Sequence, residues 1–145
     1  MTYTFLDYVF GKCELLLIVA IDFTKSNGSI HDPNSLHYLD PNNKKENEYI
    51  EAIKAIGEIL LYYDNDKMIT VLGFGAKIPP LKDKASHCFS LTGNIYQPEV
   101  FGIEGILQAY KKTLAEIEFN GPTHFAEVIR FVNEYAEFLP VTSDE

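Results

Sequence analysis

Three oxygen-bearing side chains stand at alternating positions directly after the most apolar segment of the sequence. They belong to Asp22, Thr24 and Ser26. In an extended segment, residues two and four positions apart face the same way, so we expect these side chains to present their oxygens to one point. One carboxylate with two hydroxyls suits a hard cation such as Mg²⁺, Mn²⁺ or Ca²⁺ and does not suit zinc. The alternative is that Asp22 and Ser26 cap a helix or stabilise a turn.

The element that must position these residues is the uninterrupted apolar run 15–21. Such a run predicts a parallel strand that is covered on both faces. In doubly wound sheets, ligands bind outside the carboxyl ends of the strands, which is where Asp22 stands. The following segment, 24–43, is rich in Ser, Asn, Gly, Pro and Asp. It predicts a long loop, and loops of this length are often functional.

The rest of the sequence predicts three helices and two further strands. The helices are expected at 48–63, 102–117 and 123–138, and the strands at 68–74 and 86–91. A buried strand, a crossover helix and another strand form a right-handed βαβ unit, so the predicted class is a three-layer α/β sandwich. Apolar spacing predicts the core-facing helix positions Ile50, Ile53, Ile56, Ile59, Leu60, Ile103, Ile106, Leu107, Tyr110, Leu114, Phe125, Val128, Ile129, Val132 and Tyr135.

Composition excludes several classes of partner. The 145 residues are one domain's worth, and their formal net charge is −9, which argues against a nucleic acid and against unaided docking on an anionic membrane. The apolar run 15–21 is too short to span a bilayer, and the N-terminus lacks the pattern of a signal peptide. Cys13 and Cys88 form no multi-cysteine framework, so we predict reduced thiols and a cytoplasmic protein.

Other candidate sites are weak. His31, His37, His87 and His124 are scattered, with no paired spacing that would hold zinc, although His124 adjoins Thr123. Residues 64–66 open like a calcium loop but lack its glycine and distal glutamate, so they predict a helix-to-strand turn. Residues 73–75 predict a tight strand end that excludes bulk. No nucleophile motif occurs, so we expect no enzymatic activity.

Several motifs in order resemble the von Willebrand factor A-type domain of the copine family. The motifs are residues 6–8, 19–28, 35–38, 47–49, 63–67, 73–76 with 79–80, and 121–123. The resemblance covers almost the whole chain and implies the A-domain, Rossmann-like fold. It also implies a metal-ion-dependent adhesion site, in which Asp22, Thr24 and Ser26 match the first motif and Thr123 matches the threonine of the second loop.

The resemblance further implies how such a domain works. A bound Mg²⁺, Mn²⁺ or Ca²⁺ would take a carboxylate from a protein partner, in calcium- and membrane-linked signalling. Membrane contact would be indirect, through C2 domains of the kind copines carry, with the protein cytoplasmic or peripheral at membranes. A similar domain occurs in RING-type ubiquitin ligases of plants, so a substrate-recruiting role is an alternative. A metal-free assembly role is another.

The sequence departs from the family pattern at its end. We expect residues 1–145 to form a single domain that holds only the N-terminal part of an A domain, with 139–145 as a flexible tail. The fourth strand of the family, which the resemblance places beside the first, is not present in the sequence. The strand 15–21 would then be an exposed apolar edge, which predicts a weaker cation site and possible homo-oligomers through that edge.

Overall fold

Two apolar runs pair as parallel strands at the centre of the molecule. The computed structural model describes residues 4, 6, 16–42, 44–64, 66–80 and 83–138. Strand β1 (Ile18–Asp22) lies parallel to β2 (Met68–Phe74), with Asp22 opposite Phe74. Helix α2 (Glu48–Leu60) connects them, so the predicted βαβ unit is confirmed.

The strand boundaries differ in detail from the prediction. Asp22 lies within β1 instead of just after it, and Leu15 lies outside the described residues. The strand predicted at 86–91 is only β4 (Phe89–Ser90), and Ser86 forms a separate, isolated bridge with Ala76.

Three very short strands complete the sheets. Strand β5 (Glu99–Phe101), like β4, pairs antiparallel with β2. Strand β3 (Ala76–Lys77) pairs with β6 (Glu118–Phe119) in a second, two-stranded sheet. Within the described residues, β1 has a strand partner only along its β2 side, so its other side is an edge.

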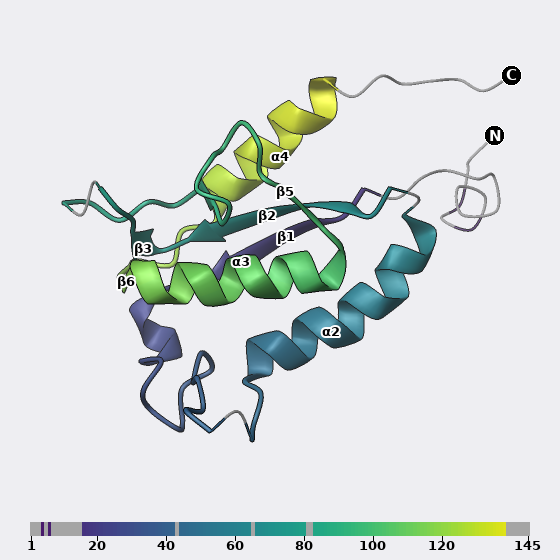
Figure 1. Cartoon of the computed structure of the whole chain (residues 1–145). Coiled ribbons are helices and arrows are strands. Elements are labelled where there is room, and N and C mark those ends of the chain that lie inside the picture. Colours follow the sequence, from purple (N-terminus) through teal and green to yellow (C-terminus); the bar gives the residue numbers. More distant parts are fainter. Residues whose placement is uncertain are drawn as a thin grey trace, which may run out of the picture.

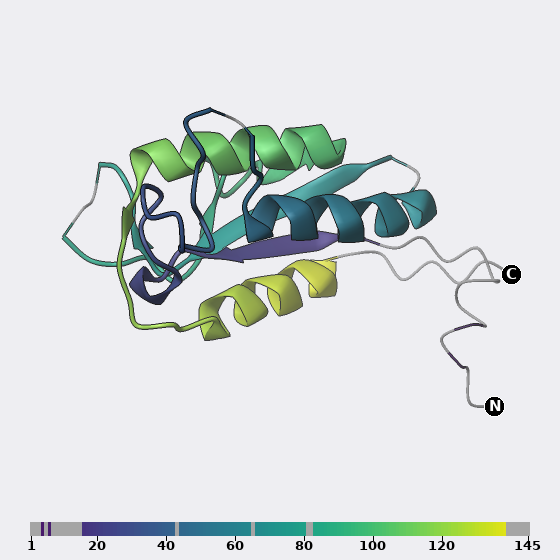
Figure 2. The same cartoon turned by 90° about the horizontal axis from the view of Figure 1, so that it is seen from below.

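Helices cover the main sheet on both faces. Helix α2 and α3 (Gly102–Glu116) lie together on one face, and α4 (Ala126–Phe138) lies on the other (Figures 1 and 2). Strand β2 supplies both cores through its alternation: Ile69 and Val71 pack under α2 and α3, whereas Leu72 and Phe74 pack against α4. The predicted three-layer α/β sandwich is confirmed.

Four of the predicted core positions are wrong. The side chains of Ile56 and Ile59 on α2 are 57% and 65% exposed, and those of Phe125 and Ile129 are 56% and 50% exposed. Helices α2 and α4 are each covered on one side only within the described residues, so an apolar stripe wider than that contact remains open. Helix α4 also begins at Ala126 and not at residue 123.

The structure also bears on the predictions for the cysteines, the C-terminal tail, residues 64–66 and membrane spans. Cys88 carries a free thiol, while Cys13 and the tail 139–145 lie outside the described residues. Where a helix-to-strand turn was predicted at 64–66, the backbone N–H groups of Lys67 and Met68 donate to the carboxylates of Asp64 and Asp66, and residue 65 lies outside the described residues. In the described ranges, no helix combines the length and apolarity needed to cross a bilayer.

Candidate functional site

Three hydroxyl groups meet where β1 ends. The hydroxyl oxygens of Thr24 and Ser26 are 3.1 Å apart, and the hydroxyl of Thr123 donates to Thr24 Oγ1 at 3.2 Å. Thr24 is buried, whereas Ser26 and Thr123 are exposed, so the cluster opens to solvent. The structure therefore brings together three of the residues that the sequence predicted as metal ligands, one of them from a distant segment.

The geometry that brings them together differs from the one predicted. Thr24 is extended, but Ser26 lies in a 3-10 helix, η1 (Lys25–Asn27), so the segment is not extended through Ser26. The turn of η1 carries the Ser26 hydroxyl back toward Thr24. Thr123 lies in an irregular segment before α4, and its hydroxyl donates to Thr24.

The carboxylate of Asp22 contacts the backbone of the segment that carries Thr24 and Ser26. Its Oδ1 accepts a hydrogen bond from the backbone N–H of Thr24 at 2.7 Å. This is the Asx-type turn that the alternative prediction described. No group among the described residues donates to the second oxygen, Oδ2. The turn therefore uses one carboxylate oxygen of Asp22 to orient the loop.

Backbone bonds hold the segments of the site side by side. The N–H of Phe23 donates to the carbonyl of Phe74 at 2.9 Å, and the N–H of Lys25 donates to the backbone carbonyl of Asn120 at 2.6 Å. The N–H of Asn120 in turn donates to the carbonyl of Gly75 at 3.0 Å. The strand ends of β1, β2 and β6 therefore meet at one edge.

Glycines allow this close approach. Gly75 has φ +80°, and a Cβ there would collide with the Cγ2 atom of Thr24. A Cβ on Gly73 would lie 2.7 Å from ring atoms of Phe23 and Phe89. The prediction that residues 73–75 exclude bulk is confirmed, and at Gly75 the excluded volume lies directly against Thr24.

A group of donors fixes the backbone of Asp22 from behind. Its carbonyl oxygen accepts from Nε2 of His37 at 2.8 Å, from the hydroxyl of Tyr49 at 3.2 Å and from Nδ2 of Asn27 at 3.3 Å. A carbonyl only accepts, so Nε2 of His37 carries the proton. The His37 ring also stacks on Tyr49, with centroids 4.1 Å apart and planes 13° apart.

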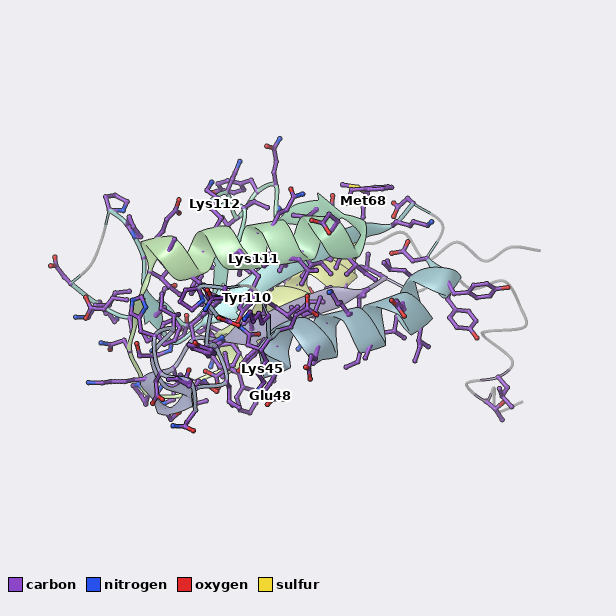
Figure 3. The ribbon with its side chains drawn as sticks, turned by 60° about the horizontal axis from the view of Figure 1, so that its bottom comes forward. Lys45, Glu48, Met68, Tyr110, Lys111 and Lys112 are labelled. Carbon is purple, nitrogen blue, oxygen red and sulfur yellow. The ribbon has the colours of Figure 1, made fainter. Side chains whose placement is uncertain are left out.

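The same histidine continues the network into the core. With Nε2 protonated, Nδ1 accepts from the hydroxyl of Tyr110 on α3, at 2.7 Å. Tyr110 points between α3 and α2 (Figure 3), and its oxygen also accepts from Nδ2 of Asn47 at 3.2 Å. Asn47 Oδ1 caps α2 by accepting from the N–H of Ile50 at 2.9 Å. We name His37, Tyr49, Tyr110 and Asn47 the support network.

Burial sets the protonation of the support network. His37 is 0% exposed, and burial lowers its pKa to about 4 against the opposing effect of the Asp22 carbonyl and charge. Burial and the nearby Asp22 charge raise the pKa of Tyr49 to about 12, and burial raises that of Tyr110 as well. All three are therefore neutral at pH 7. Sequence reasoning left His37 without a role, although its place in motif 35–38 inside a polar loop was a signal.

The oxygens of the site fit a hard divalent cation. One carboxylate and three hydroxyls form an oxygen-only set of low charge, which suits Mg²⁺ or Mn²⁺ completed by water. In the part of the chain that the structure describes, no three His, Cys, Asp or Glu side chains form a metal-holding group. The candidate cation site therefore rests on a single carboxylate, Asp22, with Thr24, Ser26 and Thr123 as neutral ligands.

A comparison with protein families decides the assignment. The family model described as Copine matches residues 35–144, which is more than half of the chain. The chain belongs to the copine family. Copine domains have the von Willebrand factor A-like fold, in agreement with the mixed sheet between helical layers. The copine match includes Thr123 and all four residues of the support network, whereas Asp22, Thr24 and Ser26 precede it.

Proposed function

We propose that this copine-type protein-interaction module binds its partners through a divalent cation at the end of β1. The observation that supports the proposal most is the convergence of the Thr24, Ser26 and Thr123 hydroxyls beside the Asp22 carboxylate. The chain residues would hold Mg²⁺ or Mn²⁺, with Ca²⁺ as a weaker fit. The ion would supply an electrophilic contact for an incoming ligand.

The chemistry of the site favours an acidic protein partner. Because only one ligand carries a charge, a bound ion keeps most of its positive charge and attracts a further carboxylate. Ser26 and Thr123 are exposed, so such a carboxylate can approach from solvent. The module is proposed to bind and not to catalyse. Contact with membranes would be indirect, through C2 domains, and the protein would be cytoplasmic.

Thermal unfolding with added cation tests this proposal. A ligand that binds only the folded state stabilises it by about 2.7 kcal/mol at about 100 times its Kd. We expect Mg²⁺ or Mn²⁺ to raise the Tm of the unsubstituted chain and to leave that of Asp22→Ala unchanged. Asp32→Ala is the matched control, because Asp32 is an exposed acid in the following loop, and it should respond like the unsubstituted chain.

The alternative role is structural, without metal. The bond from the Thr24 N–H to Asp22 Oδ1 gives this alternative some support, because it already provides the carboxylate with a purpose. A Tm that saturating Mg²⁺ and Mn²⁺ both leave unmoved, with Asp22→Ala behaving like the unsubstituted chain, would favour the structural role and exclude the cation site.

We also propose that two copies associate through β1. Its free edge leaves backbone N–H and C=O groups without strand partners in the described residues, and Ala20 on it is exposed. Beside this edge lies an apolar groove of about 180 Å³. The groove is lined by Leu17, Val19, Ala20, Ile21, Tyr49, Ala52, Ile53, Ile56, Gly57 and Ile106. Pairing of one edge with the same edge of a second copy would satisfy the backbone groups in a two-fold dimer.

Light scattering at increasing protein concentration tests the dimer. We expect the mass to rise toward that of two chains, and we expect Ala20→Lys to suppress the rise by placing a charge at the edge. Gln108→Lys, on the exposed side of α3, is the control and should still associate. A mass of one chain at all concentrations would contradict the proposal.

A further inference from the structure

Two histidine rings from different segments lie against each other beside the start of α4. The ring centroids of His87 and His124 are 5.0 Å apart, with planes 42° apart. His87 lies in the segment that leads into β4, and His124 lies between β6 and α4. The pair is therefore assembled by the fold, and its spacing in the sequence does not reveal it.

One nitrogen of this pair is buried without a hydrogen bond. Nδ1 of His87 is buried and has no partner among the described residues. A buried polar atom without a partner is destabilising, and most such atoms in folded proteins are hydrogen-bonded. The contrast with His37 is direct, because both ring nitrogens of His37 are hydrogen-bonded. His87 therefore has ligand capacity that the fold itself does not use.

The separation of the rings matches two imidazoles on one ion. With metal–nitrogen distances of about 2.0–2.1 Å and a tetrahedral angle, two coordinating rings have centres about 5 Å apart. Imidazole nitrogen suits Zn²⁺, Cu²⁺ and Ni²⁺, in contrast to the oxygen ligands around Asp22. We propose that His87 and His124 form a two-histidine site for a transition-metal ion such as Zn²⁺, separate from the oxygen-lined site.

The proposed site has two protein ligands, so its affinity for the metal ion is limited. In the described ranges, no third His, Cys, Asp or Glu joins the pair as a ligand group, so water completes the coordination. The ion links the segment that carries Thr123 to the segment that leads into β4. His124 is exposed, which leaves the pair open to solvent.

Calorimetric titration with zinc chloride at saturating Mg²⁺ tests this site. We expect one saturable Zn²⁺ per chain, with an affinity at least tenfold weaker in His87→Ala and in His124→Ala. His31→Ala is the matched control, since His31 is exposed in the loop that follows β1, and it should bind Zn²⁺ unchanged. Asp22→Ala should also bind Zn²⁺ unchanged, so the two metal sites can fail independently.

Folding of the variants is checked separately. Because His124 is exposed, His124→Ala should keep the Tm of the unsubstituted chain without zinc, and zinc should raise only the Tm of the unsubstituted chain. This pair of measurements decides the matter even if His87→Ala does not fold. Saturable zinc binding that survives in His124→Ala, binding that is lost equally in His31→Ala, or no saturable binding would overturn the proposal.

Discussion

The two sides of Asp22 differ in how completely their polar atoms are partnered. Behind the strand, its carbonyl accepts from His37, Tyr49 and Asn27, in a buried aromatic surrounding. In front, its carboxylate has one backbone donor, and the neighbouring hydroxyls bond chiefly to one another. If the proposed cation site is correct, the buried side fixes the backbone of Asp22, and the open side provides the acceptors for a ligand.

The largest expected effect comes from removing His37 from the support network behind Asp22. His37→Ala removes a side chain that is 0% exposed, together with its bonds to Asp22 and Tyr110, so we expect the free energy of unfolding to fall by about 3 kcal/mol. Urea denaturation measures the change. His31→Ala removes an exposed histidine and should change stability by less than about 0.5 kcal/mol. Equal effects of the two substitutions would show that the support network does not stabilise the fold.

Acid should lower the free energy of unfolding of the unsubstituted chain by protonating His37. The unfolded chain protonates His37 near its ordinary pKa of 6.5, whereas the folded chain protonates it only near about 4. The unfolded state therefore binds more protons between these values, so stability is full above pH 6.5 and falls as the pH drops toward 4. The expected loss is about 3 kcal/mol.

Denaturation at a series of pH values checks this dependence. His37→Gln keeps a side chain that can donate and accept but removes the titration, so its stability should fall less steeply between pH 6.5 and 4. Identical slopes for the two proteins would mean that His37 is not the group responsible.

The smallest expected change in stability affects the open side. Thr24→Val removes the hydroxyl shared by Ser26 and Thr123 but keeps the shape of the side chain against Gly75, so we expect a loss of about 1 kcal/mol. Thr113→Val is the control, because Thr113 is also buried and donates to a backbone carbonyl away from the site. Both variants should fold, but only Thr24→Val should lose the rise in Tm with Mg²⁺. A retained rise would separate the hydroxyl cluster from cation binding.

The central part of the fold could be predicted from sequence because its signals are long. The run before Asp22, the apolar run 68–74 and the periodic helix between them were sufficient for the parallel βαβ unit. Strands β3, β5 and β6 could not be predicted, because two or three residues are too few to show a period of two. Exposure of Ile56 and Ile59 could not be predicted either, since periodicity identifies an apolar face but not whether a neighbour covers it.

The sequence predicted which residues form the candidate site, but it did not predict how they are arranged. Residue types and strand position indicated Asp22, Thr24 and Ser26, and the family resemblance indicated Thr123. The 3-10 turn at Ser26 and the roles of His37 and Tyr110 depend on contacts between distant segments. The His87–His124 pair depends on such contacts as well. A local pattern can single out a residue such as His37, but it does not show which distant residue it contacts.

The measurement that tests the central claim most directly is paramagnetic broadening of amide NMR signals by substoichiometric Mn²⁺. If the Asp22 carboxylate and the three hydroxyls hold a cation, signals from residues 22–27 and 121–124 should broaden first, and excess Mg²⁺ should restore them. Asp22→Ala should abolish the effect at these residues. Broadening centred on other acidic segments, or identical broadening in Asp22→Ala, would contradict a cation site at the end of β1.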